Sequence, residues 1–223
     1  MQTSLFATSF QDSETDRISD SSLFQTPFDD AVFVVLDLET TGLSPKKNSI
    51  TEITAITYQN NQDLEMFSTL VKPNEDIPPE VEALTGITNE MVAQAPPLLM
   101  AMNELFAFMG TRPILVGHNV GFDLAFLQAK AEECGFYGME ERLSPSRSFC
   151  TKVLAQKILP PLPSYEGILV ATQCGYYNPN PHRAEADVRM SAAILFALVQ
   201  KSRDNGTPIH TVDDLLDLQG RLS

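Results

Sequence analysis

Four acidic residues and one histidine have types and spacings that suit hydrolytic chemistry. Asp37 and Glu39 stand two apart in the segment DLETTG, Asp123 ends the segment HNVGFD, and His182 precedes Asp187 by five positions in HRAEAD. Carboxylates from such distant segments can meet only in the folded chain, where they repel one another unless divalent cations lie between them. The pattern therefore predicts a two-metal phosphodiesterase.

Hydrolysis of a phosphodiester needs an ionised water, stabilised charge on the phosphorus oxygens and a neutralised leaving oxygen. Two metal ions roughly 3.5–4 Å apart meet these needs. Carboxylate oxygens are the ligands that Mg²⁺ and Mn²⁺ prefer. We predict that Asp37, Glu39, Asp123 and Asp187 bind two such cations, either Mg²⁺ or Mn²⁺. An imidazole titrates near neutrality, so His182 is expected to take the proton from the attacking water.

The elements that position these residues follow from the hydrophobic pattern. The Val-rich run 31–39 predicts a central buried strand that ends in the first carboxylates. Further strands are expected at 50–58, 63–73 and 113–119, with Pro-rich helical turns at 77–94. Helices are expected at 98–109, 121–134, 148–159, 164–174 and 184–201. This order predicts an α/β fold, a mixed central sheet flanked by helices.

The predicted elements pre-align part of the site. Alternate residues of a strand point to the same side, so Asp37 and Glu39 would project together. Asp123 and Asp187 would each lie early in a helix. By itself, Asp123 could instead be a helix N-terminal charge that complements the macrodipole. His118 is expected to be a packed or backbone-bonded histidine and not a ligand.

The three motifs resemble those of the DEDDh 3′–5′ exonuclease family, which includes proofreading subunits of bacterial replicative DNA polymerases. The resemblance spans about residues 32–199 and implies a ribonuclease H-like fold with the metal ligands and base named above. In a sister group the base is a tyrosine at the position of Arg183. One departure is the pair Glu166 and Gly167, where relatives usually carry lysine and leucine. The resemblance also places five residues near the terminal nucleotide: Thr40, Thr41, Glu80, Thr85 and Asn119.

The activity implied by the resemblance is the release of nucleoside 5′-monophosphates from single-stranded or frayed DNA 3′ ends, in proofreading or repair. Two alternatives stay open. A 3′–5′ exoribonuclease trimming RNA ends or short oligoribonucleotides would use the same five residues, because they are indifferent to the 2′-hydroxyl. A non-catalytic docking subunit would instead bind replication proteins. A polymerase catalytic subunit and the sliding clamp are candidate partners.

The charge composition of the chain bears on how it could bind nucleic acid. The chain has 15 basic and 29 acidic residues, a net charge of −14, whereas proteins that hold nucleic acid usually present a basic face. Weak intrinsic affinity for polymer, and hence a tether, is expected; Lys46, Lys47 and Arg183 are the best-placed cations for phosphate contact.

The three cysteines form no CxxC pair, so neither a disulfide framework nor a zinc site is indicated. No apolar run spans a bilayer, which predicts a cytoplasmic protein without membrane contact.

Three regions are expected along the chain. Residues 1–30 are acidic and rich in Ser and Thr, which predicts a disordered tail whose two apolar clusters, 4–10 and 22–28, are candidate docking motifs. Residues 31–203 form the predicted exonuclease domain, and 204–223 a short amphipathic C-terminal extension. The first cluster resembles clamp-binding peptides, with Gln2, Leu5 and Phe6 as its anchors.

Overall fold

The computed structural model describes residues 20–178 and 180–220. The predicted clamp-docking residues Gln2, Leu5 and Phe6 lie outside these described residues. Within them, no helix is long and apolar enough to cross a bilayer.

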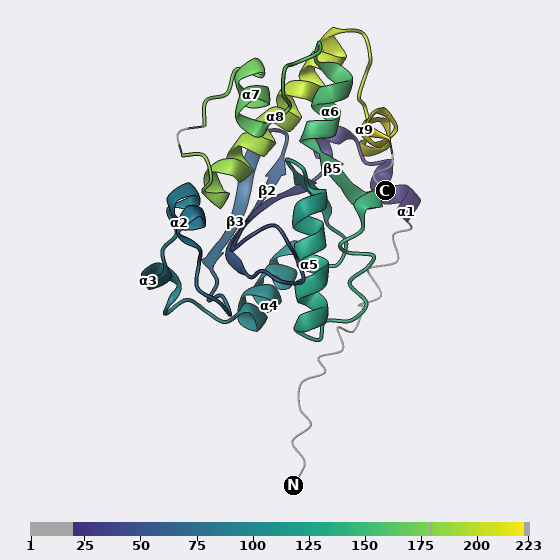
Figure 1. Ribbon diagram of the computed structural model, residues 1–223. Helices are drawn as coiled ribbons and strands as arrows, with labels where there is room; N and C mark the ends of the chain where they lie inside the picture. Colours follow the sequence, from purple (N-terminus) through teal and green to yellow (C-terminus); the bar gives the residue numbers. More distant parts are fainter. Residues whose placement is uncertain (1–19, 179, 221–223) are drawn as a thin grey trace.

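A single mixed sheet of five strands, in the order β3-β2-β1-β4-β5, forms the centre of the described molecule (Figure 1). Strand β1 (Phe33–Thr40) lies in the middle, antiparallel to β2 (Ile50–Gln59) and parallel to β4 (Ile114–Gly117). Strands β3 (Gln62–Leu70) and β5 (Ser148–Cys150) form the edges. The predicted α/β fold with a central first strand is confirmed.

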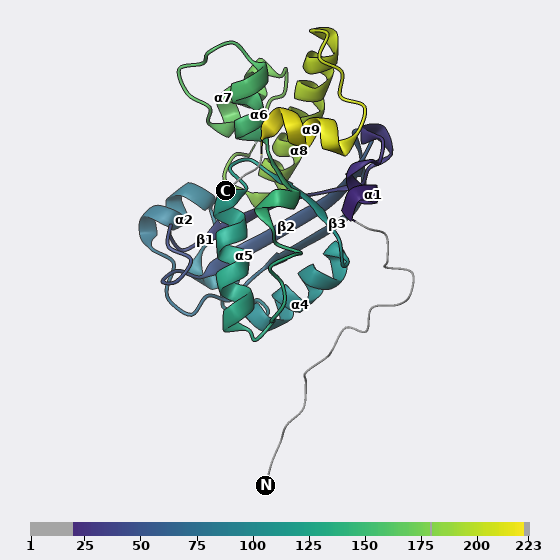
Figure 2. The same cartoon turned by 90° about the vertical axis from the view of Figure 1, so that its right-hand side faces the viewer.

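Helices cover both faces of this sheet (Figures 1 and 2). The helices are α1 (Asp20–Phe24), α2 (Pro79–Thr85), α3 (Asn89–Val92), α4 (Leu98–Met109), α5 (Gly121–Glu133), α6 (Thr151–Ile158), α7 (Gly167–Gln173), α8 (Ala184–Asp204) and α9 (Val212–Gln219), with short 3-10 turns at Phe28–Asp30 and Pro145–Arg147. The side chains of β1 alternate between two cores: Phe33 and Val35 pack with α6, α7, α8 and α9, whereas Val34 and Leu36 pack with α4 and α5. By the same alternation, Asp37 continues the face that α8 covers.

The expected helix at 148–159 is wrong at its beginning. Residues Ser148–Cys150 form β5, which pairs in parallel with β4, and the helix starts only at Thr151. A buried run of three residues carries no period of its own. It becomes a strand because β4 offers a parallel edge.

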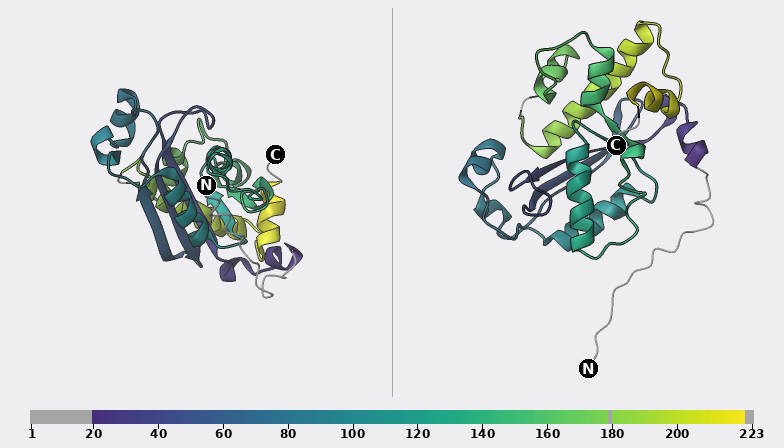
Figure 3. Two further views of the ribbon diagram at one scale, coloured as in Figure 1. Left: turned by 90° about the horizontal axis from the view of Figure 1, so that it is seen from below. Right: turned by 45° about the vertical axis from the view of Figure 1, so that its right-hand side comes forward.

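The prediction that residues 1–30 are disordered is wrong for residues 20–30. Phe28 is 1% exposed, with its ring centroid 5.0 Å from that of Phe33 and 5.8 Å from that of Phe196. The backbone N–H of Phe28 donates to the carbonyl of His210 (2.8 Å). The second apolar cluster therefore fills the core instead of offering a docking motif, and α1 lies beside α9 (Figures 2 and 3).

The expected C-terminal extension is an amphipathic helix, α9, whose described residues pack into the domain. Val212 and Leu215 are buried, and Gln219 is 3% exposed. The Gln219 side chain accepts from the backbone N–H of Cys150 (2.7 Å) and donates to the carbonyl of Ser148 (3.0 Å). These bonds satisfy backbone groups of the edge strand β5.

Candidate active site

Three carboxylates meet where the end of β1 faces the start of α8. Asp37 and Glu39 project from β1, and Asp187 is the fourth residue of α8. One oxygen from each of the three carboxylates lies within 4.8 Å of the other two, a spacing that could hold a metal ion. The alternation of β1 and the helical start thus bring together residues 150 positions apart in sequence.

Asp123 reaches the same place from α5. It is 3% exposed, and its Oδ1 accepts a hydrogen bond from the backbone N–H of Leu38 (3.2 Å), the residue between Asp37 and Glu39. Its charge is also one of those that raise the pKa of Asp37. Asp123 is therefore tied to β1 beside Asp37, but it is not one of the three carboxylates whose oxygens lie within 4.8 Å of one another.

The cluster holds its negative charge poorly without cations. Burial, followed by repulsion from Asp123, Glu39 and Asp187, raises the pKa of Asp37 well above its usual range. Burial and then repulsion from Asp187, Glu52 and Asp123 raise the pKa of Glu39 to about 8. Burial raises the pKa of Asp123 to about 8 as well. The repulsion between these carboxylates is relieved either by protonation or by bound divalent metal ions.

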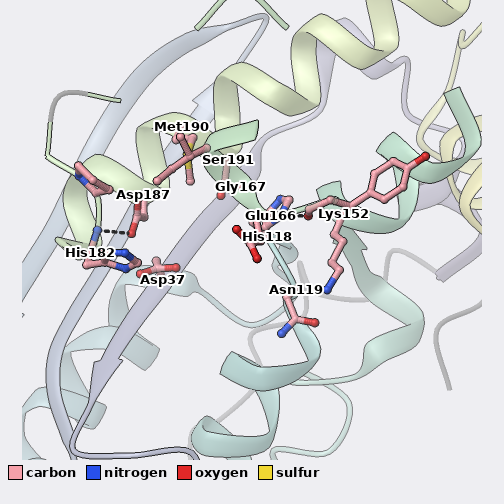
Figure 4. Close-up of a pocket in the computed structure, with 13 residues that line it drawn as sticks. Asp37, His118, Asn119, Lys152, Glu166, Gly167, His182, Asp187, Met190 and Ser191 are labelled. Atoms are coloured by element: carbon pink, nitrogen blue, oxygen red, sulfur yellow. Dashed lines mark hydrogen bonds between the residues drawn. The ribbon is translucent and has the colours of Figure 1, made fainter. Parts of the chain in front are cut away.

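His182 lies next to this cluster, in the turn before α8. Its backbone is left-handed (φ 63°), and its N–H donates to Oδ2 of Asp187 (3.0 Å). The amide of Asn178 donates to Oδ1 of the same carboxylate (2.6 Å). Burial raises the pKa of Asp187, while these hydrogen bonds act in the opposite direction. Figure 4 shows the imidazole of His182 beside the carboxylates of Asp37 and Asp187.

A pocket of about 350 Å³ opens beside these groups. Asp37, His182 and Asp187 line one side of it, and Lys152 and Asn119 line the side across from them (Figure 4). Sequence reasoning missed Lys152, because a lysine in the first turn of a helix resembles any solvated surface charge.

His118 also lines the pocket, as a packed residue. Its Nδ1 shares a hydrogen bond with the hydroxyl of Thr151 (2.8 Å), and its Nε2 one with the carbonyl of Tyr165 (2.9 Å). Burial lowers its pKa. The prediction of a packed, backbone-bonded histidine is confirmed.

The predicted nucleotide contacts have different surroundings. Asn119 lines the pocket, and Glu80 is exposed on α2. The hydroxyl of Thr40 donates to the carbonyl of Gly42 (2.7 Å), and that of Thr41 donates to Glu75. Thr85 is 4% exposed, and its hydroxyl donates to the carbonyl of Val81 (3.0 Å). In this structure the three threonine hydroxyls bond to the protein itself, so they brace the loops around the site.

Sequence reasoning also missed the partner of Arg183. Its guanidinium, expected to contact phosphate, pairs with the buried carboxylate of Glu52 at 2.9 Å (Nη2 to Oε1). Glu52 lies directly opposite Glu39 in the register of β1 and β2. Lys46 and Lys47, by contrast, are exposed in the turn after β1. No sequence motif marks Glu52, because its role depends on the register between two strands.

The departure at Gly167 has a packing reason. A Cβ placed there would lie 2.6 Å from Cε of Met190, so the methionine occupies the space that a larger residue would need. Glu166 lines the pocket beside it. The substitution therefore changes the pocket wall while the carboxylate cluster stays intact.

A mixed sheet with clustered carboxylates at its central strand and flanking helices defines a ribonuclease H-like nuclease fold. The family model described as Exonuclease matches residues 34–195, and the chain belongs to this family. Its members depend on divalent metal ions, for which the carboxylate cluster provides a suitable donor set.

Relatives of this chain include subunits of replicative polymerases. It is 33% identical to the DNA polymerase III subunit epsilon of Aquifex aeolicus over 172 residues, which cover 77% of this chain and 82% of that protein. It is also 33% identical to the 3′-5′ exonuclease DinG of Bacillus subtilis over 77% of this chain, but spans only 18% of DinG. It spans 29% of a putative bifunctional exonuclease/endonuclease of Mycobacterium tuberculosis, at 35% identity over 83% of this chain.

Solved structures share the fold. Exonuclease X in complex with 5′ overhanging duplex DNA aligns with a TM-score of 0.62 and 24% identity, covering 84% of this chain and 99% of that one. Escherichia coli exonuclease I in complex with a dA16 oligonucleotide aligns with a TM-score of 0.69 and 19% identity, covering 83% and 43%. The predicted ribonuclease H-like fold is confirmed.

Proposed function

We propose that this protein is a 3′–5′ exonuclease that removes nucleoside 5′-monophosphates from single-stranded or frayed DNA 3′ ends during replication proofreading or repair. The main observation that supports this proposal is that carboxylate oxygens of Asp37, Glu39 and Asp187 lie within 4.8 Å of one another, and that His182 lines the same pocket as Asp37 and Asp187. Relatedness to an epsilon subunit supports the DNA substrate and the replication role.

The carboxylates are proposed to hold two divalent cations, Mg²⁺ or Mn²⁺. The donor set fits hard cations, because Asp37, Glu39, Asp123 and Asp187 offer only oxygen ligands and resist ionising together. When bound, such ions lower the pKa of a coordinated water and neutralise charge on the phosphate and leaving oxygens.

His182 is proposed to accept the proton of the attacking water at its imidazole. The bond from its own N–H to Asp187 keeps the residue at the edge of the cluster. A positioned general base contributes about 10²- to 10⁴-fold to the rate. The exposed turn leaves the imidazole open to exchange protons with solvent.

Lys152 and Asn119 are proposed to bind the strand next to the scissile phosphate. They line the same pocket as the carboxylates and lie across from them (Figure 4). A pocket of about 350 Å³ suits a nucleotide unit of a single strand. Such a pocket would favour single-stranded or frayed ends over paired ones.

The test is a nuclease assay on 5′-labelled 3′-mismatched DNA, fully paired DNA and RNA of the same sequence, each with and without EDTA. Stepwise shortening of the mismatched DNA, its loss in EDTA and its loss in the His182→Ala variant are expected. Activity that persists in EDTA would contradict the proposal. Preferred digestion of RNA would favour the exoribonuclease alternative, and digestion unaffected by Asp37→Ala would favour the docking subunit.

A further inference from the structure

A fifth acid lies beside the catalytic cluster without belonging to it. Glu52 on β2 is 5% exposed and directly opposite Glu39, whose pKa its charge helps to raise. Burial of a carboxylate is strongly unfavourable unless it is paired and hydrogen-bonded. A buried acid next to like charges therefore needs a compensating partner.

Its partners are two consecutive residues, Arg183 and Ala184. Oε1 of Glu52 accepts from Nη2 of Arg183 (2.9 Å), and Oε2 accepts from Nε of Arg183 (3.4 Å) and from the backbone N–H of Ala184 (3.1 Å). Arg183 is the N-cap residue of α8 and makes no side-chain cap bond, so a carboxylate from β2 satisfies the first amide of the helix. Both residues directly follow His182.

The segment 182–184 is thus held from two sides. Asp187 accepts the N–H of His182, and Glu52 accepts from the two residues that follow. A left-handed backbone at a residue other than glycine, as at His182, is unfavourable, and such a conformation persists only when its surroundings fix it. The Glu52 contacts are positioned to supply that constraint.

Two other roles for the pair fit less well. Glu52 does not belong to the group of carboxylates whose oxygens lie within 4.8 Å of one another, Asp37, Glu39 and Asp187, so it is not placed as a further metal ligand. A phosphate contact by Arg183 would leave the buried Glu52 charge unpaired, which is costly.

We infer that Glu52 is a positioning residue for His182: through Arg183 and the first amide of α8, it orients the imidazole toward the catalytic carboxylates. This inference rests on the proposed exonuclease function. A small displacement of a catalytic group can lower a rate up to about 100-fold. Loss of the Glu52 charge is therefore expected to lower kcat about 10- to 100-fold, with little change in KM for DNA.

The test is a double-mutant cycle of Glu52→Gln and His182→Ala, measured as single-turnover cleavage of single-stranded DNA in Mn²⁺. If Glu52 acts through His182, Glu52→Gln lowers kcat in the wild-type background and has no further effect in the His182→Ala background. Equal losses in both backgrounds would overturn the inference. An inactive wild type, or a His182→Ala variant with wild-type activity, would instead contradict the proposed function.

Arg183→Lys and Arg183→Met extend the test to variants that keep Glu52. Arg183→Lys retains the charge and should keep more activity than Arg183→Met; identical activity in the two would count against the ion pair. Glu185→Gln is the matched control, an exposed acid in the same helical turn that pairs with Arg189 (3.0 Å), and its kcat should stay unchanged. Thermal melting of each variant identifies losses that come from unfolding.

Discussion

At the scale of single residues, the site is a compromise between charge repulsion and function. The raised pKa values of Asp37, Glu39 and Asp123 mean that the folded protein binds protons there more tightly than the unfolded chain does. Ionisation of these groups therefore weakens folding in the absence of metal ions. Removal of one carboxylate should relieve repulsion at the cost of activity.

Asp37→Asn is the direct test of that compromise. The variant should show no measurable nuclease turnover, and its metal-free form should melt above the metal-free wild type, by about 2–4 °C for each kcal/mol of repulsion removed. Nuclease assays and calorimetry in EDTA check the two effects. A metal-free variant that melts below the wild type would show that Asp37 stabilises the fold through its charge.

The pH dependence follows from the same shifts. A carboxyl group whose folded pKa is raised contributes stability below its unfolded pKa, about 4, and loses it as pH rises through the folded value, about 8 for Glu39. The melting temperature of the metal-free wild type should therefore fall between pH 5 and pH 8 relative to that of an Asp37→Asn/Asp187→Asn variant. Mg²⁺ should raise it more at pH 8 than at pH 5, because protons compete with the metal. An equal effect of Mg²⁺ at both pH values would contradict this assignment.

At the scale of elements, the segment 20–30 stabilises the domain by burying Phe28 in its core. Phe28 is almost fully buried against Phe33 and Phe196. Phe28→Ala should lower the free energy of unfolding by about 3–5 kcal/mol and leave kcat unchanged at temperatures where the variant is folded. Urea denaturation measures the loss. Tyr137→Ala, at an 84% exposed position, is the control and should change stability by less than about 0.5 kcal/mol.

Elements with their own period were predictable from sequence, and elements made by distant partners were not. Val-rich β1 and the helix α5 were expected close to their observed bounds, because each carries its hydrophobic pattern locally. Strand β5 escaped prediction because it forms by pairing with β4. The burial of Phe28 escaped prediction because its position depends in part on the hydrogen bond to the carbonyl of His210.

The same distinction applies to the site. The carboxylates and His182 stand in motifs with fixed spacing, so the sequence predicted their convergence. Glu52 and Asn178 stand in no motif; strand register and the fold of the turn before α8 bring them to the site.

At the scale of the whole molecule, a net charge of −14 disfavours binding to the phosphate backbone of DNA. Each contact between a cationic side chain and a phosphate is therefore expected to contribute measurably to affinity. Lys152→Ala should raise KM for single-stranded DNA and reduce the dependence of log affinity on log salt by about 0.7, the value for one contact to a single strand. Lys157→Ala, at an exposed lysine of the same helix, is the control. Equal effects of the two substitutions would remove Lys152 from the substrate path.

A tether is also expected to compensate for the weak affinity of the acidic surface for DNA. The peptide with Gln2, Leu5 and Phe6 is proposed to dock on the sliding clamp and so to raise the local concentration of enzyme at DNA. Leu5→Ala/Phe6→Ala should abolish capture by purified clamp while activity on free oligonucleotides stays the same. Equal capture of wild type and variant would end the proposal.

Anomalous diffraction from a crystal soaked in Mn²⁺ tests most directly whether the four carboxylates assemble as a metal centre. Two anomalous peaks in contact with the carboxylates of Asp37, Glu39, Asp123 and Asp187 are expected. A crystal at saturating Mn²⁺ with no anomalous peak at these side chains would contradict the account.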